Sequence, residues 1–199
     1  MRRISHHLKI LLFVFISFSF FNYSKAQTGG GGKFSGGLIV TLGQGKMGNG
    51  TDVPNRTMIY TPVSLFAGYN IKKFRIGGHY EYNIAGQSAD PASVSNQNLS
   101  GKGSALGVRL DYYDGKQSAG LIYRLSDTFN LDKPTSSGAS AVYKSKGGFQ
   151  IQYYRQIQKR FGFVVDYTTE TFDDSLASSV KWDRLALGLV ITNFNSSGR

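Results

Sequence analysis

The sequence predicts an all-β protein, an eight-stranded antiparallel up-and-down transmembrane β-barrel. From residue 29 onward, apolar residues alternate with small or polar ones in eight separate runs. The runs are close to the 9–11 or so residues that a tilted strand needs to cross a bilayer, whereas strands of soluble proteins are mostly about 5–6 residues long. Long and short connections alternate along the chain, which is expected of a barrel with its long loops at one end.

The first four predicted strands span 33–43, 58–71, 74–86 and 102–113. The third is the clearest, because Arg75, His79 and Glu81 all lie on the face opposite its apolar residues. In chain order, the apolar faces of these four strands carry Leu38 and Val40, Val63 and Leu65, Ile76 and Tyr80, and Val108 and Leu110.

The last four predicted strands span 116–126, 143–155, 161–172 and 180–194. Long connections are expected at 44–57, 87–101, 127–142 and 173–179, so Asp127 and Asp173 are assigned to loops. In chain order, the apolar faces of these four strands carry Leu121 and Tyr123, Phe149 and Ile151, Phe163 and Val165, and Leu187 and Leu189.

The first 26 residues have the parts of a secretory signal peptide. Arg2 and Arg3 precede an apolar stretch over 10–21, and cleavage is expected after Ala26. The alternative is an uncleaved anchor helix, but the apolar stretch is shorter than the roughly 20 residues that span a membrane. Residues 1–26 are therefore assigned to a signal peptide and residues 27–199 to the barrel domain.

The composition excludes several kinds of site. There is no cysteine, so disulfides, thiolate metal sites and an acylated cysteine are excluded. The formal net charge is +11, and an excess of basic residues often indicates nucleic acid, but export makes that partner unexpected. No cofactor or metal is expected.

Two short turns fix the expected register of neighbouring strands. A two-residue turn at 72–73 and an Asp-Gly turn at 114–115 both place polar faces against polar faces. The faces are assigned from polarity alone, so this agreement supports the assignment. The expected pairs are Leu65 with Tyr80, and Arg109 with Gly120.

Alternation alone does not say which face lies inside. A lipocalin-like soluble barrel is apolar inside, and a membrane barrel is apolar outside. The apolar faces carry almost no charge through their central parts, while the opposite faces mix glycine with charges of both signs, which favours the membrane. Trp182 falls on the polar face of its predicted strand, so it is not one of the outward aromatic residues expected beside the short turns. Those aromatic residues are Tyr69, Phe74, Tyr112, Tyr153 and Phe161.

Charged side chains inside such a barrel must pair, because eight strands leave an interior that side chains fill. A turn at 156–160 pairs Lys146 with Glu170 and Gln150 with Asp166, and Arg184 is the expected partner from the last strand. The predicted interior ion-pair network consists of Arg75, Glu81, Arg109, Asp111, Arg124, Lys146, Asp166, Glu170 and Arg184.

Taken together, these features resemble the small outer-membrane β-barrel family typified by the OmpA transmembrane domain and OmpX. The resemblance covers residues 33–194 in architecture and implies a bacterial outer-membrane location with both termini in the periplasm. Members of that family commonly end on an aromatic residue. Here Phe194 is followed by residues 195–199 and has the parity opposite to that of Ile191.

Two patterns that could carry chemistry are interpreted otherwise. Residues 43–48 fit G-x-G-x-x-G, but no helix follows, so a flexible loop is expected. Ser64, His79 and Glu81 meet in the expected register and resemble the catalytic groups of lipid A-modifying barrel enzymes. They should point into a filled barrel, so no enzyme is expected.

The expected function is a structural outer-membrane protein, porin-like in fold, whose long loops bind a partner or surface. A narrow channel for small solutes is the alternative from another class, and a lipid A-modifying enzyme is a third. The expected partners are outer-membrane lipid, lipopolysaccharide and an unidentified surface ligand, with no nucleic acid. A monomer is expected.

Overall fold

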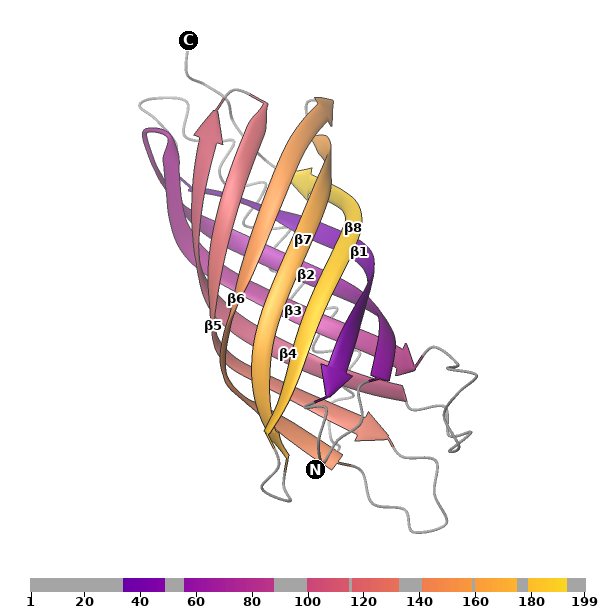
Figure 1. Ribbon diagram of the computed structural model, residues 1–199. Coiled ribbons are helices and arrows are strands. Elements are labelled where there is room, and N and C mark those ends of the chain that lie inside the picture. The colour runs from indigo at the N-terminus through magenta and orange to yellow at the C-terminus, as the bar shows by residue number, and fades with distance from the viewer. Residues whose placement is uncertain are drawn as a thin grey trace, which may run out of the picture.

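Eight antiparallel strands form one closed barrel, each paired with its neighbours in chain order and β8 paired with β1 (Figure 1). The computed structural model describes residues 34–48, 56–87, 100–114, 116–132, 141–158, 160–174 and 179–192. This confirms the predicted eight-stranded up-and-down barrel. The strands are β1 (Phe34–Gly48), β2 (Arg56–Ile71), β3 (Phe74–Gln87), β4 (Ser100–Asp114), β5 (Gln117–Asp132), β6 (Ala141–Gln158), β7 (Phe161–Asp174) and β8 (Ser179–Thr192).

The strands run further toward the long connections than the sequence predicted. They contain 14 to 18 residues, more than a tilted strand needs to cross the apolar part of a bilayer. The segment 43–48, expected to be a flexible loop, is instead the end of β1, where Gly45 pairs with Met58 and Arg184 on the two neighbouring strands. The predicted signal peptide and Phe194 lie outside the described residues.

One of the expected registers is confirmed and one is wrong by two residues. Leu65 pairs with Tyr80, as the turn at Lys72 and Lys73 predicted. Between β4 and β5, Gly120 pairs with Asp111 and not with Arg109, because the ladder closes at Asp114 and Gln117. A shift of two residues keeps each face on its own side.

Two bulges change which residues point inward. In β5 the ladder shifts beside Leu106, so Leu125 and Ser126 are both exposed and Asp127 is turned inside. In β6 it shifts between Ser145 and Gly147, where Gly147 has a φ of 119°. An extra residue in one strand reverses the inward and outward parity beyond it.

A band of apolar side chains covers the outside of all eight strands. Thirty large apolar or aromatic side chains are exposed, among them Val108 at 47%, Leu121 at 47% and Leu187 at 60%. Soluble monomers rarely expose an apolar surface that extends over a whole molecule. The outward band is therefore suited to contact with lipid acyl chains.

Among the residues that the structure describes, no helix is long and apolar enough to cross a membrane.

The aromatic residues expected beside the short turns point outward, as the alternation predicted. Phe34 packs edge-on against Tyr69 with ring centroids 5.2 Å apart, and Phe74 lies 5.3 Å from Tyr112. Aromatic rings at this level are typical of the interfacial girdle of membrane barrels.

Beyond the girdle, at the short-turn end of the barrel, Lys73 Nζ lies 3.1 Å from Asp114 Oδ1. The hydrogen bond to Asp114 raises the pKa of this exposed amine.

Candidate functional site: the filled interior of the barrel

The structure places eight of the nine residues of the predicted network inside the barrel. Arg109 and Arg124 are 4% and 1% exposed, in contrast to the outward apolar residues beside them on the same strands. The eight interior residues are Arg75, Glu81, Arg109, Asp111, Arg124, Asp166, Glu170 and Arg184.

The ninth residue, Lys146, was wrongly assigned to the interior. It lies at the β6 bulge with its side chain 59% exposed, and it pairs with Asp173 of β7 at 2.9 Å. The bulge also moves Gly148 to the position opposite Glu170. A Cβ on Gly148 would lie 2.9 Å from the Cβ of Glu170, so the glycine leaves room for the glutamate side chain.

At the short-turn end, two arginines share one aspartate and one aromatic ring. Arg75 Nε donates to Asp111 Oδ2 at 2.8 Å, and Arg109 Nε donates to Asp111 Oδ1 at 2.8 Å. The Cζ atoms of both arginines lie 4.3 Å from the centroid of the Phe66 ring, in the range of cation–π contacts. Gly120 faces this cluster, and a Cβ there would come within 3.0 Å of Arg109 Nη2.

Two glutamines of β6 connect this cluster to the middle of the barrel. Gln152 accepts a hydrogen bond from Arg109 Nη1 at 2.5 Å and donates to Asp166 Oδ2 at 2.6 Å. Gln150 Nε2 is also close to Asp166 Oδ2, at 2.5 Å, and lies 3.0 Å from Glu81 Oε2. The predicted Gln150–Asp166 contact is therefore present, although Gln152 is the residue directly opposite Asp166.

Toward the long connections, two arginines bind the remaining carboxylates. Arg124 lies 3.0 Å from Glu81 and 2.7 Å from Asp127, and its Nε is 3.0 Å from Glu170 Oε2. Arg184 Nη2 donates to Glu170 Oε2 at 2.7 Å and is 4.0 Å from Asp127 Oδ2. The sequence assigned Asp127 to a loop, and only the β5 bulge brings it into this cluster.

The described interior contains four guanidinium groups, five carboxyl groups and one imidazole. Asp166 is held by neutral donors, whereas each of the other four carboxyl groups is within 4 Å of at least one arginine. Those donors are Gln150, Gln152 and Thr168, the last at 3.0 Å. The network is thus a continuous chain of contacts, and removing different carboxyl groups should have different costs.

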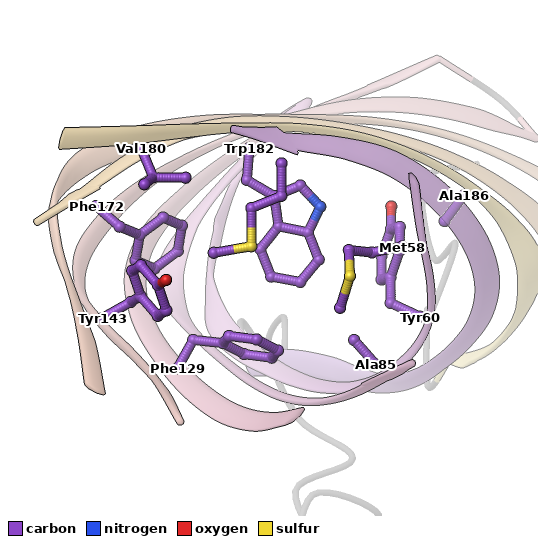
Figure 2. Close-up of a cluster of buried hydrophobic side chains, with 10 residues drawn as sticks. Met58, Tyr60, Ala85, Phe129, Tyr143, Phe172, Val180, Trp182 and Ala186 are labelled. Carbon is purple, nitrogen blue, oxygen red and sulfur yellow. The ribbon is translucent and has the colours of Figure 1, made fainter. Parts of the chain in front are cut away.

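Between the network and the long connections lies a plug of apolar and aromatic side chains, which was not predicted from the sequence. Figure 2 shows Tyr60, Phe129 and Phe172 converging from the barrel wall around the indole of Trp182. The ring centroids of Phe129 and Trp182 are 4.9 Å apart, and Arg184 Cζ lies 4.4 Å from the indole centroid, where the plug meets the network. The inward parity of Trp182 was the signal in the sequence.

A smaller apolar cluster lies inside the barrel as well. It consists of Ile39, Phe66, Tyr154, Val164 and Val190. Because guanidinium groups of the network lie over the Phe66 ring, this cluster is in direct contact with the polar network. Side chains therefore fill the described interior through the network and both apolar clusters, as expected for eight strands.

Ser64, His79 and Glu81 do come together, but not in the arrangement of a hydrolase. The Ser64 hydroxyl donates to Glu81 Oε2 at 3.3 Å, and His79 Nε2 is 3.7 Å from the same oxygen. A catalytic serine must instead hydrogen-bond to the imidazole that takes its proton. All three side chains are buried. Among the described residues, no cluster of three or more histidine or acidic side chains is arranged to hold a metal ion.

No protein-family model matches the chain, and no curated protein sequence is significantly similar to it. Solved structures do match. Ail, the attachment invasion locus protein of Yersinia pestis, is 11% identical with a TM-score of 0.57, covering 80% of this chain and 99% of Ail. Neisserial surface protein A is 12% identical with a TM-score of 0.57, covering 79% of this chain and 96% of that protein. The fold is therefore that of the small outer-membrane β-barrels, as the sequence predicted.

Ail also matches as a complex with the heparin analogue sucrose octasulfate. In that comparison the TM-score is 0.56 at 11% identity, covering 80% of this chain and 99% of Ail.

Proposed function

We propose that this protein resides in the bacterial outer membrane as a sealed, non-conducting barrel whose long connections face outward and bind a surface partner. One observation carries this proposal: a band of apolar side chains covers the exposed face of every strand, while four arginines and five carboxyl groups are packed inside. Transferring the outward band from water to lipid is favourable, and the buried ions keep their partners.

The filled interior argues against the narrow-channel alternative. Four buried arginines and their partners occupy the interior, and Trp182 and its neighbours fill the space between them and the long connections. A barrel of eight strands has little room beyond that of its own side chains. Solutes would have to displace both the plug and the network.

A surface-binding role is supported by the likeness in fold to Ail, which has been solved with a heparin analogue. The filled barrel would act as a rigid mount for the segments that connect β1 to β2, β3 to β4, β5 to β6 and β7 to β8. In this proposal the partner is recognised outside the cell, and the barrel is a monomer held by outer-membrane lipid.

Three measurements on the full chain test this function. Membrane fractionation should recover the protein in the outer membrane, and its gel mobility in detergent should change on heating, as a folded barrel becomes unfolded. Protease added to intact cells should cut the chain in its long connections. Recovery in the soluble periplasm would refute the proposal, and stable conductance steps in planar bilayers would favour the channel.

A further inference from the structure

One side of the barrel carries a cluster of outward basic side chains near its long-connection end. We name it the rim patch, and it extends over the adjacent strands β6, β7, β8 and β1. The pairing places Lys144 opposite Asp173, Thr171 opposite Lys181, and Lys46 opposite Asp183, so the strands bring these residues side by side. The rim patch consists of Lys46, Lys144, Lys146, Thr169, Thr171, Asp173, Lys181 and Asp183.

The rim patch begins where the outward apolar band ends. On β8 the last outward apolar residue is Leu185, and Asp183 is the next outward residue; on β7, Thr169 follows Tyr167. On β1, Lys46 lies four residues beyond Leu42, or about 13 Å along the strand and less in depth because the strand is tilted. These positions are at the depth of lipid headgroups, and lysine side chains extend readily toward that level.

The acidic residues of the rim patch are already bound within it. Lys146 lies 2.9 Å from Asp173, and Lys181 lies 3.0 Å from Asp183. The hydroxyl of Thr169 also donates to Asp183, at 2.6 Å. Among the described residues, Lys46 and Lys144 have no ion-pair partner within 4 Å, so the patch keeps an excess of positive charge.

The opposite wall has no comparable feature. At the same level, the outward positions of β2 and β3 carry Thr57, Ile59 and Ile84, which bear no charge. On β4 a single exposed lysine, Lys102, lies opposite Ile84, against four lysines in the rim patch. Headgroup contact that was uniform around the barrel would not require four lysines on one side. The asymmetry points to a bound anion with a defined position.

We propose that the rim patch binds the phosphate groups of a lipid in the outer leaflet, the lipid A part of lipopolysaccharide. Its phosphates would be held by the amines of Lys46 and Lys181 on one side and of Lys144 and Lys146 on the other. Ammonium groups bind phosphate strongly as point charges, and the threonine hydroxyls add neutral donors. The acyl chains would lie along the apolar band below, beside Tyr167. This inference rests on the proposed outer-membrane location.

The test measures binding of purified lipid A to the full-length folded protein in detergent. The test variant is Lys46→Ala/Lys144→Ala/Lys146→Ala/Lys181→Ala, and the matched control is Lys72→Ala/Lys73→Ala, which removes exposed lysines at the opposite end of the barrel. We expect the test variant to bind bisphosphorylated lipid A about ten-fold more weakly or worse, and the control to bind as the unsubstituted protein does. Dephosphorylated lipid A should bind the unsubstituted protein as weakly as it binds the test variant.

Equal binding by the test variant, an equal loss in the control, or equal binding of dephosphorylated lipid A would each overturn the proposal. So would binding of soluble sucrose octasulfate in preference to lipid A. Heat-dependent gel mobility shows whether the variant still folds, and a second variant, Lys46→Gln/Lys144→Gln, replaces it if it does not. Membrane fractionation of the unsubstituted protein tests the location separately, so the two failures can be distinguished.

Discussion

Replacing Glu170 with leucine should destabilise the barrel strongly. Its carboxylate accepts from Arg184 Nη2 at 2.7 Å and lies 3.0 Å from Arg124 Nε, and all three side chains are almost fully buried. After Glu170→Leu, Arg124 keeps close contacts with Glu81 and Asp127. Arg184 keeps only contacts of 4.0 Å with those two residues, so it is left as a poorly compensated buried charge.

Removing one partner of a buried ion pair costs about 3–5 kcal/mol. For a chain of about this length, 1 kcal/mol changes the unfolding midpoint by roughly 2–4 °C, so we expect a decrease of about 10 °C. Trp182 is the only tryptophan and is fully buried in the plug, so its fluorescence reports unfolding directly. The heat-dependent gel shift gives a second, independent midpoint.

Asp166→Asn is the matched control for Glu170→Leu. Asp166 is bound by neutral donors, so an amide oxygen can replace the oxygen that accepts from Gln150 and Gln152, and Thr168 can accept from the new amide. We expect a change of about 1 kcal/mol or less, as for a neutral hydrogen bond. An unchanged or higher midpoint in Glu170→Leu, or an equal loss in both variants, would refute this account of the network.

Three further predictions concern the bulge, a glycine and the plug. Lys146→Ala should change the unfolding free energy by less than about 1 kcal/mol, because its pair with Asp173 is exposed; a larger loss would mean that Lys146 belongs to the buried network. Gly120→Val should cost about 1–3 kcal/mol, since its side chain would press on Asp111 and Arg109; urea unfolding with an unchanged midpoint would contradict the packing. Phe172→Ala should cost about 3–5 kcal/mol and shift Trp182 emission to the red; an unshifted spectrum would mean that the plug does not shield the indole.

The strands and their faces could be predicted from the sequence because the two environments are so different. Lipid on one side and packed ions on the other leave a period of two that persists along every strand. The β2–β3 register was also predictable, because Lys72 and Lys73 form a two-residue turn in which Lys72 has a φ of 53°. Neither result required knowledge of distant contacts.

The two errors about which way a side chain points, at Lys146 and Asp127, arose at bulges, where one extra residue reverses the alternation. Lys146 has the parity of Gln150 in the sequence, yet it points outward because the ladder shifts before Gly147. Asp127 enters the interior for the same kind of reason, after two successive outward residues in β5. A bulge depends on how two strands fit together, so periodicity within one strand cannot locate it.

The sequence does contain a signal for the plug. Trp182 has the wrong parity for the outer girdle. Tyr60, Phe129 and Phe172 also lie on inward positions near the long connections, and these aromatic residues on different strands fill one space (Figure 2). Aromatic residues on the polar parity of several strands therefore predict a packed interior.

The orientation of the two faces is tested most directly by single cysteines, since the chain contains none of its own. Leu121, Ile122 and Tyr123 are consecutive apolar residues of β5, with exposed fractions of 47%, 0% and 46%. Spin labels at cysteines replacing each in turn should be relaxed by oxygen dissolved in lipid at positions 121 and 123, and should be protected at 122. A label at 122 that is as accessible to lipid as its two neighbours, or labels at 121 and 123 that are reached only by a water-soluble relaxing agent, would contradict a sealed barrel with its apolar face toward lipid.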